Sequence, residues 1–157
     1  MSAFVAKVLT VSDGVTHGSR DDLSGPALVD ALRIAGADIA ELRVCADGAE
    51  VVAAALHEMS TDFRGVIVTT GGTGFAPRDE TPEGTRLVIE REAPGLAEAM
   101  RGISPLGRLS RGIAGIVGGC IIINTPGSPK GCVEQLNAVI DVLPHAVALL
   151  NQFPTEH

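Results

Sequence analysis

The segment Gly71-Gly72-Thr73-Gly74 directly follows a short apolar run. Glycine lets a ligand approach the backbone closely, and successive exposed N–H groups can bind an anion. The segment is neither a P-loop nor a dinucleotide fingerprint, because the Gly-Lys-Ser/Thr and G-x-G-x-x-G patterns are missing. A tight turn without a ligand explains the four residues about equally well. The acidic residues behind the turn favour a phosphate site.

Carboxylates follow several of the expected strands. Asp79 and Glu80 come just before an expected helix, while Asp13 and Asp47 each follow an apolar run. Mg²⁺ prefers oxygen ligands and uses one or two carboxylates beside substrate phosphates. The alternatives are solvated acids that interact with a helix dipole and, for Asp47, a helix cap. The pattern favours a metal between the acids and a phosphate, with the three aspartates converging.

A second candidate anion site is the segment 124–131, Asn-Thr-Pro-Gly-Ser-Pro-Lys-Gly. Ser128 and the start of the following helix offer hydrogen-bond donors, and Lys130 is one of two lysines in the chain. A well-capped helix start with a solvated lysine remains the alternative. Ser110 precedes an expected hairpin, where an ordinary polar turn is equally possible. No H-E-x-x-H or G-x-S-x-G pattern supports a zinc site or a hydrolase triad.

The elements that must position these residues alternate along the chain. Apolar β-branched runs predict strands at 4–12, 38–45, 64–70, 113–117 and 120–124. Helical spacing predicts helices at 24–35, 49–59, 81–92, 94–102 and from 129, the last restarting at Pro144. We expect Ser24, Thr81 and Ser128 to cap helices and 13–24 to be a loop.

This alternation predicts an α/β fold with a mostly parallel sheet and helices on both faces. Gly118-Gly119 between two apolar runs predicts an antiparallel hairpin at one edge. Ligands of such sheets bind beyond the carboxyl ends of the strands, where four polar loops would gather. We expect one domain over residues 1–157, with a flexible tail from about 151.

Composition excludes several classes of function. The chain has 157 residues, 12 basic and 19 acidic, and a formal net charge of -7, which argues against non-specific binding of nucleic acid or anionic membranes. Three cysteines without a C-x-x-C pair give no disulfide framework and indicate a reducing compartment. With no signal peptide at the N-terminus and no long apolar span, we expect a cytoplasmic protein.

Taken together, the motifs resemble the molybdopterin-binding family of molybdenum cofactor biosynthesis, of the MogA/MoaB type. The resemblance covers nearly the whole chain in the same order. It rests on Thr70-Gly71-Gly72-Thr73-Gly74, Arg78-Asp79-x-Thr81-Pro82-Glu83, Asn124-x-Pro126-Gly127-Ser128-Pro129-Lys130-Gly131, Ser12-Asp13, Asp22-x-Ser24-Gly25 and Ser110-Arg111-x-x-Ala114-Gly115.

The resemblance implies a three-layer α/β/α domain, often a homotrimer. The implied reaction is Mg²⁺-dependent transfer of AMP from ATP to the terminal phosphate of molybdopterin, which gives adenylyl-molybdopterin and pyrophosphate. Catalytic and metal-binding roles fall on Asp47 and Asp79. Substrate-binding roles fall on Ser12, Asp13, Gly71, Gly72, Thr73, Gly74, Thr81, Glu83, Ser110, Pro126, Gly127, Ser128 and Lys130. Ser110 and the segment 128–130 belong to the pterin side.

One departure from the family pattern is Gly14, where the family often has a larger, basic residue. Arg20 or Arg78 is the expected substitute. Two other functions stay open on this evidence: a molybdopterin carrier without turnover, and a nucleotide-processing enzyme on the same scaffold. A molybdate-insertion enzyme is a further expected partner.

Overall fold

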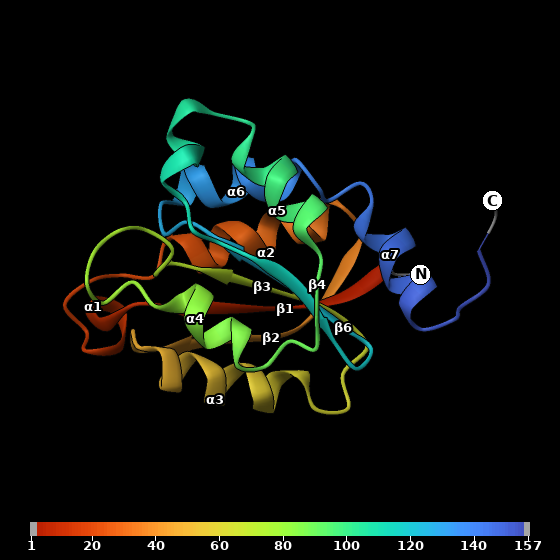
Figure 1. The fold of residues 1–157 in the computed structure, drawn as a ribbon, viewed down its shortest axis with the longest axis horizontal. Helices are drawn as coiled ribbons and strands as arrows, with labels where there is room; N and C mark the ends of the chain where they lie inside the picture. The colour runs from red at the N-terminus through yellow and green to blue at the C-terminus, as the bar shows by residue number, and fades with distance from the viewer. Residues whose placement is uncertain (1–2, 156–157) are drawn as a thin grey trace.

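The computed structural model describes residues 3–155, built around one six-stranded sheet (Figure 1). The strands are β1 (Phe4–Val11), β2 (Ala37–Cys45), β3 (Gly65–Thr70), β4 (Arg91–Glu92), β5 (Ala114–Val117) and β6 (Cys120–Thr125). Their order across the sheet is β2-β1-β3-β6-β5-β4. The first four strands of this order pair in parallel, whereas β5 is antiparallel to β6 and to β4.

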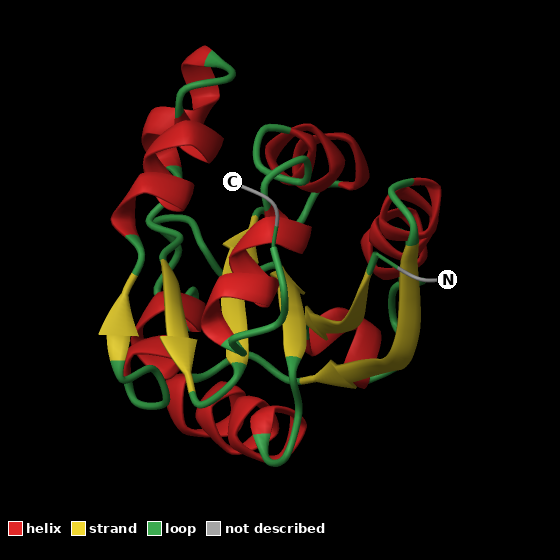
Figure 2. Cartoon of the chain, turned by 90° about the vertical axis from the view of Figure 1, so that its right-hand side faces the viewer, coloured by secondary structure: helices red, strands yellow, loops and turns green. Residues whose placement is uncertain are grey.

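Helices cover both faces of the sheet, which confirms the predicted three-layer α/β/α arrangement (Figure 2). One face carries α2 (Ser24–Ile34), α5 (Pro94–Arg101), α6 (Pro129–Asn137) and α7 (Leu143–Leu150). The other face carries α3 (Ala49–Ser60), which packs against α4 (Thr81–Arg86). The chain also forms two short helical segments, α1 (Asp13–Thr16) and the 3₁₀ helix η1 (Pro105–Leu109).

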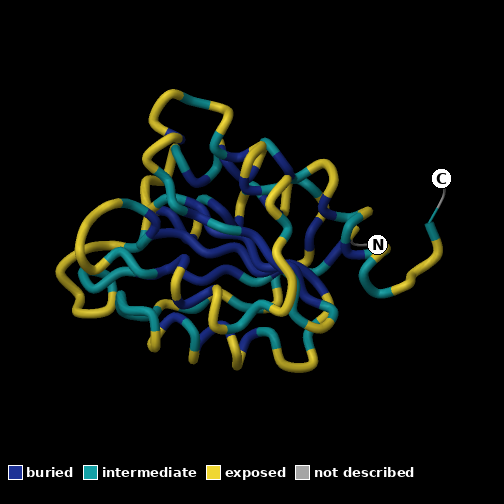
Figure 3. Tube along the Cα trace, viewed as in Figure 1, coloured by how far each residue is buried: buried dark blue, intermediate teal, exposed yellow. Residues whose placement is uncertain are grey.

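The apolar core lies along the central strands, as the buried trace in Figure 3 shows. Every residue of β3 and β6 is buried, because helices cover both faces of these strands. Burial raises the pKa of the Cys120 thiol to about 12, and none of the three cysteines forms a disulfide. No helix within residues 3–155 is long and apolar enough to span a membrane.

The hairpin at Gly118-Gly119 and the restart of the last helical region at Pro144 are confirmed. The expected helix 81–92 is wrong in its second half, because α4 ends at Arg86 and the chain then joins the sheet. The amide of Glu90 donates to the carbonyl of Ile116 at 2.7 Å, and Ile89 packs into the core below the sheet. The antiparallel edge therefore has β4 as an additional strand.

Helix starts are corrected at three places. Residues 13–16 form α1, capped by the Ser12 side chain, rather than a loop. Ser24 and Thr81 are the first residues of their helices and cap neither. In α2 the Asp22 carboxylate accepts from the Gly25 amide at 3.0 Å, which replaces the expected cap. Ser128 caps α6 as expected, accepting from the Gly131 amide at 3.0 Å.

Candidate functional site

The polar loops after β1, β2, β3 and β6 meet at one edge of the sheet, because these four strands are parallel. Two adjoining cavities open there, a small cavity of about 600 Å³ and a large cavity of about 1200 Å³. Both are lined by Gly72, Asp79, Gly127 and Ser128. Two ligands bound in the two cavities would therefore meet at these four residues.

Asp13 and Asp47 are joined by two hydrogen bonds, each from the backbone amide of one residue to the carboxylate of the other. The Asp13 amide donates to Oδ2 of Asp47 at 2.9 Å, and the Asp47 amide donates to Oδ1 of Asp13 at 3.1 Å. Arg78 joins them: its Nε lies 2.6 Å from Oδ2 of Asp13, and its Nη2 donates to Oδ1 of Asp13 and to the Asp47 carbonyl. The hydrogen bond from Arg78 lowers the pKa of the Asp13 carboxyl.

The glycine turn lies against two carboxylates. A Cβ at Gly72 would lie 3.3 Å from Oδ1 of Asp47, and one at Gly74 would lie 2.9 Å from Oδ2 of Asp79. The φ angles of Gly71 and Gly72 are +100° and +68°, a region in which other residues are strained. Glycine is therefore required here both for the turn and for the approach of the aspartates.

The free oxygens of this corner belong to Asp47 and Asp79. Oδ2 of Asp47 accepts from Asp13, and Oδ2 of Asp79 accepts from the Ala76 amide at 3.0 Å. Within residues 3–155, Oδ1 of either side chain accepts no hydrogen bond. Asp13, in contrast, uses both of its carboxylate oxygens and lines neither cavity. Of the three aspartates expected to converge, two line the small cavity, and each has one carboxylate oxygen without a hydrogen bond within residues 3–155.

The donor set fits Mg²⁺ better than a metal with a complete protein shell. No three His, Cys, Asp or Glu side chains between residues 3 and 155 are grouped to hold a metal ion. Mg²⁺ is usually bound through one or two carboxylates and completes its shell with water and substrate phosphates. Asp47 and Asp79 beside a glycine turn supply such a set.

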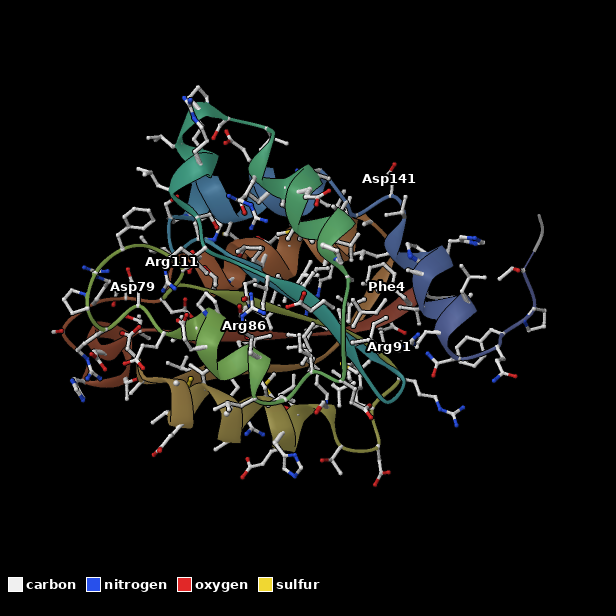
Figure 4. All side chains as sticks on the ribbon, viewed as in Figure 1. Phe4, Asp79, Arg86, Arg91, Arg111 and Asp141 are labelled. Atoms are coloured by element: carbon white, nitrogen blue, oxygen red, sulfur yellow. The ribbon has the colours of Figure 1, made fainter. Side chains whose placement is uncertain are left out.

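Arg111 also holds the loop that contains the glycine turn. Figure 4 shows it near Asp79 at the same end of the sheet. Its Nε donates to the Gly74 carbonyl at 2.8 Å and its Nη2 to the Asp79 carbonyl at 2.5 Å. The guanidinium also pairs with Glu83 at 2.8 Å, which lowers the pKa of that carboxyl. Arg111 therefore ties residues 74 and 79 of the loop together, and Arg78 anchors the same loop to Asp13 and Asp47.

Three predicted substrate-binding residues, Asp13, Thr81 and Glu83, line neither cavity, and the last two support the loop framework instead. The Thr81 hydroxyl donates to the Gly71 carbonyl at 2.8 Å, and Glu83 binds Arg111. The other predicted residues are distributed as follows. The small cavity is lined by Ser12, Asp47 and Gly71, the large cavity by Thr73, Gly74, Ser110, Pro126 and Lys130, and both cavities by Gly72, Asp79, Gly127 and Ser128.

The large cavity has an apolar rim that the sequence did not indicate. Ile103, Leu106 and Leu109, from the segment around η1, line it and are 42%, 76% and 54% exposed. Lys130 also lines it, with its Nζ 3.8 Å from Glu134. Such a cavity suits a ligand that combines an apolar surface with an anionic group.

The small cavity is also lined by Arg20, one of the two expected basic substitutes, and by Asp22, which was not predicted as a site residue. Asp22 accepts from the Thr10 hydroxyl at 3.0 Å and from the Gly25 amide, so it fixes the loop that enters α2. The motif Asp22-x-Ser24-Gly25 was the available signal. It did not identify a site residue because an aspartate before a helix is commonly just a cap.

Comparison with known proteins gives consistent matches. Residues 7–145 match the model of a probable molybdopterin-binding domain. The chain is 39% identical to a molybdopterin adenylyltransferase of Helicobacter pylori J99, over 91% of this chain and 85% of that protein. Identity to the Drosophila melanogaster molybdenum cofactor synthesis protein cinnamon is 37%, over 96% of this chain. The chain spans only about a quarter (26%) of that longer relative.

Among solved structures, the molybdopterin biosynthesis enzyme MoaB of Thermus thermophilus superposes with a TM-score of 0.89. The two sequences are 41% identical, and the match covers 98% of this chain and 99% of that chain. The two proteins therefore share the fold over nearly the whole chain.

Proposed function

The chain belongs to the molybdopterin-binding domain family of molybdenum cofactor biosynthesis, and on this premise we propose that it adenylylates molybdopterin. The reaction transfers AMP from ATP to the terminal phosphate of molybdopterin and releases pyrophosphate. The observation that carries the proposal is the junction of two cavities at a glycine turn with free carboxylate oxygens. A transfer between two substrates needs such a junction, whereas a site for one ligand does not.

The proposed roles follow from position. The pterin occupies the large cavity, between Ser110 and Lys130, and the nucleotide occupies the small cavity. A terminal phosphate oxygen of molybdopterin attacks the α-phosphorus of ATP. The new O–P bond forms as the α–β bond breaks, and the electron pair leaves with pyrophosphate. Such a transfer depends on positioning and charge stabilisation more than on a strong base.

The protein's own groups hold the reacting phosphates. Amides of residues 72–74 bind phosphate oxygens, whereas the Gly71 amide is engaged by the Thr125 carbonyl. Asp47 and Asp79 would hold Mg²⁺ through their free oxygens. When bound, Mg²⁺ neutralises phosphate charge that the two carboxylates would otherwise repel. Arg111 and Thr81 keep the turn in place from behind.

Release of pyrophosphate by the purified protein tests the proposal. ATP, Mg²⁺ and molybdopterin are each omitted in turn, and we expect release only when all three are present. Asp79→Asn and Asp47→Asn should abolish most of it, while Asp141→Asn serves as a matched control on an exposed aspartate far from Asp79 (Figure 4). Tight pterin binding without release would favour a carrier. Release without pterin would favour a nucleotide-processing enzyme.

We also propose a homotrimer that acts in the cytoplasm and passes its product to a molybdate-insertion enzyme. The free cysteines suit a reducing compartment. Light scattering of the purified protein would give three times the chain mass if the trimer is correct.

A further inference from the structure

We infer that Arg78 is a positioning residue for the site, which acts on Asp47 through Asp13. The inference rests on the proposed function, because it takes Asp47 as one of the two residues that hold Mg²⁺. It concerns three loops that follow three different strands: Asp13 comes after β1, Asp47 after β2 and Arg78 after β3. Nothing in their local sequence fixes these loops relative to one another.

The contacts form a closed circuit. Arg78 approaches both carboxylate oxygens of Asp13, at 2.6 and 3.2 Å, and also donates to the Asp47 carbonyl at 3.1 Å. Asp13 and Asp47 then exchange amide-to-carboxylate hydrogen bonds of 2.9 and 3.1 Å. The exchange engages Oδ2 of Asp47, so the other oxygen, Oδ1, is left beside Gly72. The rotation of the Asp47 carboxylate is thus determined by groups outside the cavity.

The same contacts argue against a direct role for Asp13 or Arg78 on the ligand. Neither residue lines either cavity. Both oxygens of Asp13 are engaged, and the planar guanidinium fork faces Asp13 and the Asp47 backbone. Arg78 is also 64% exposed, so its ion pair contributes little to stability. What the pair does supply is orientation, the role of outer groups at many metal sites.

Of the two arginines expected near Asp13, the structure brings Arg78 to its carboxylate, 65 residues along the chain. Arg20 lines the small cavity instead. The cation of the circuit is therefore the loop arginine, next to Asp79.

A double-mutant cycle tests the inference. Arg78→Gln, Asp13→Asn and the double variant are compared by kcat/KM for pyrophosphate release, with Arg86→Gln as the control. Arg86 is an exposed arginine that pairs with Glu92 on the far part of the sheet edge. Each single variant should lose about 10–100-fold, as outer-shell changes typically do. The double variant should lose no more than one of them, because both break the same circuit. Arg78→Lys keeps the positive charge but lacks the planar guanidinium, so it should recover only part of the lost kcat/KM.

A second readout does not depend on turnover. Mn²⁺ binding with α,β-methylene-ATP, followed by electron paramagnetic resonance, should weaken about 10-fold or more in Arg78→Gln. The amides of Asp13 and Asp47 should exchange faster with solvent, while the unfolding temperature stays near that of the wild type.

Losses that multiply in the double variant would overturn the inference, as would a raised KM for ATP in Arg78→Gln that Asp13→Asn does not share. That result would make Arg78 a direct phosphate ligand. A wild-type protein without pyrophosphate release would overturn the proposed function instead. Unchanged Mn²⁺ binding and amide exchange in Arg78→Gln would then still overturn the positioning role.

Discussion

The two cavities at the sheet edge are built on different principles. The small cavity is walled by loops that hydrogen-bond to one another across three strands, through Asp13, Asp47 and Arg78. The large cavity is bounded by the exposed apolar side chains of the η1 segment and by Lys130. Its polar side is formed by the glycine turn, by Ser110 and by the loop that begins at Pro126.

Because of this difference, we expect the small cavity to orient the reacting groups and the large cavity to supply binding affinity. The carboxylates of Asp47 and Asp79 in the small cavity are oriented by hydrogen bonds, as transfer of a phosphoryl group requires. The apolar rim of the large cavity offers contact surface without directional hydrogen bonds. Its contribution to binding depends on the apolar area that a ligand buries there. The residues that line both cavities, Gly72 and Asp79 among them, should matter for both properties.

A substitution at a residue that lines both cavities should have the largest effect on stability and activity. In Gly72→Ala the new Cβ would meet the Thr81 hydroxyl and lie at a φ of +68°. The conformation costs about 1–2 kcal/mol, and the crowding costs about 1–3 kcal/mol more. Urea unfolding should show this loss, together with lost turnover and weakened binding in both cavities.

Gly18→Ala is the matched control for that variant. Its φ of +80° is similar, but a Cβ there would have nothing within 4 Å. It should cost only the conformational part. Equal losses of stability in the two variants would show that Thr81 moves aside without cost.

Asp47→Asn should distinguish the roles of the two cavities most clearly, because Asp47 lines the small cavity only. We expect kcat for pyrophosphate release to fall by about 10²–10³-fold, the effect of losing one electrostatic partner of the transition state. The dissociation constant for pterin, read from pterin fluorescence, should stay within about twofold of the wild type. A matching loss of pterin affinity would mean that the cavities do not act separately.

Leu106→Ser should have the opposite pattern, with weaker pterin binding and an unchanged kcat. Leu106 lines only the large cavity and is 76% exposed, so folding does not depend on it. Losing its contact area should weaken pterin binding by several-fold, about 1 kcal/mol, with kcat at saturation unchanged. Fluorescence titration and saturation kinetics measure the two quantities. An effect on kcat alone would assign η1 to the chemistry instead.

The smallest expected effect concerns pH. Arg111 lowers the pKa of Glu83 below its ordinary value of 4.5, so this pair adds stability above pH 4.5 that disappears as the pH falls through the folded-state pKa. In Glu83→Gln the denaturation midpoint should therefore be slightly lower at neutral pH and converge with the wild type at acidic pH. A constant gap at every pH would mean that the pair acts through packing alone.

Sequence periodicity predicted the elements whose character is local. The buried strand 64–70, the hairpin at Gly118-Gly119 and the Ser128 cap all follow from neighbouring residues. It missed β4 because two residues at an edge carry no periodic signal, and their pairing with β5 depends on residues more than 20 positions away. Thr81 failed as a cap for the same reason, since its partner is the Gly71 carbonyl.

The candidate site divides in the same way. Loop chemistry indicated Asp47, Asp79 and the glycine turn. The fold brings both aspartates and the first half of the turn to the small cavity, and the second half of the turn to the large cavity. The braces were not foreseeable, because the partners of Arg78 and Arg111 are set by how strands align rather than by spacing. The apolar rim was missed as well, because η1 has no amphipathic pattern long enough to recognise.

The circuit of Asp13, Asp47 and Arg78 also has a consequence for how the molecule folds. Its members lie in the segments that follow three successive strands, and Arg78 lies 65 residues from Asp13. Closing so long a loop is entropically slow, so the circuit forms only after β1, β2 and β3 have aligned. A chain still emerging from the ribosome therefore has no complete site before the loop after β3 appears. A ligand that needs the circuit recognises the finished fold alone, and its binding shifts the folding equilibrium toward that state.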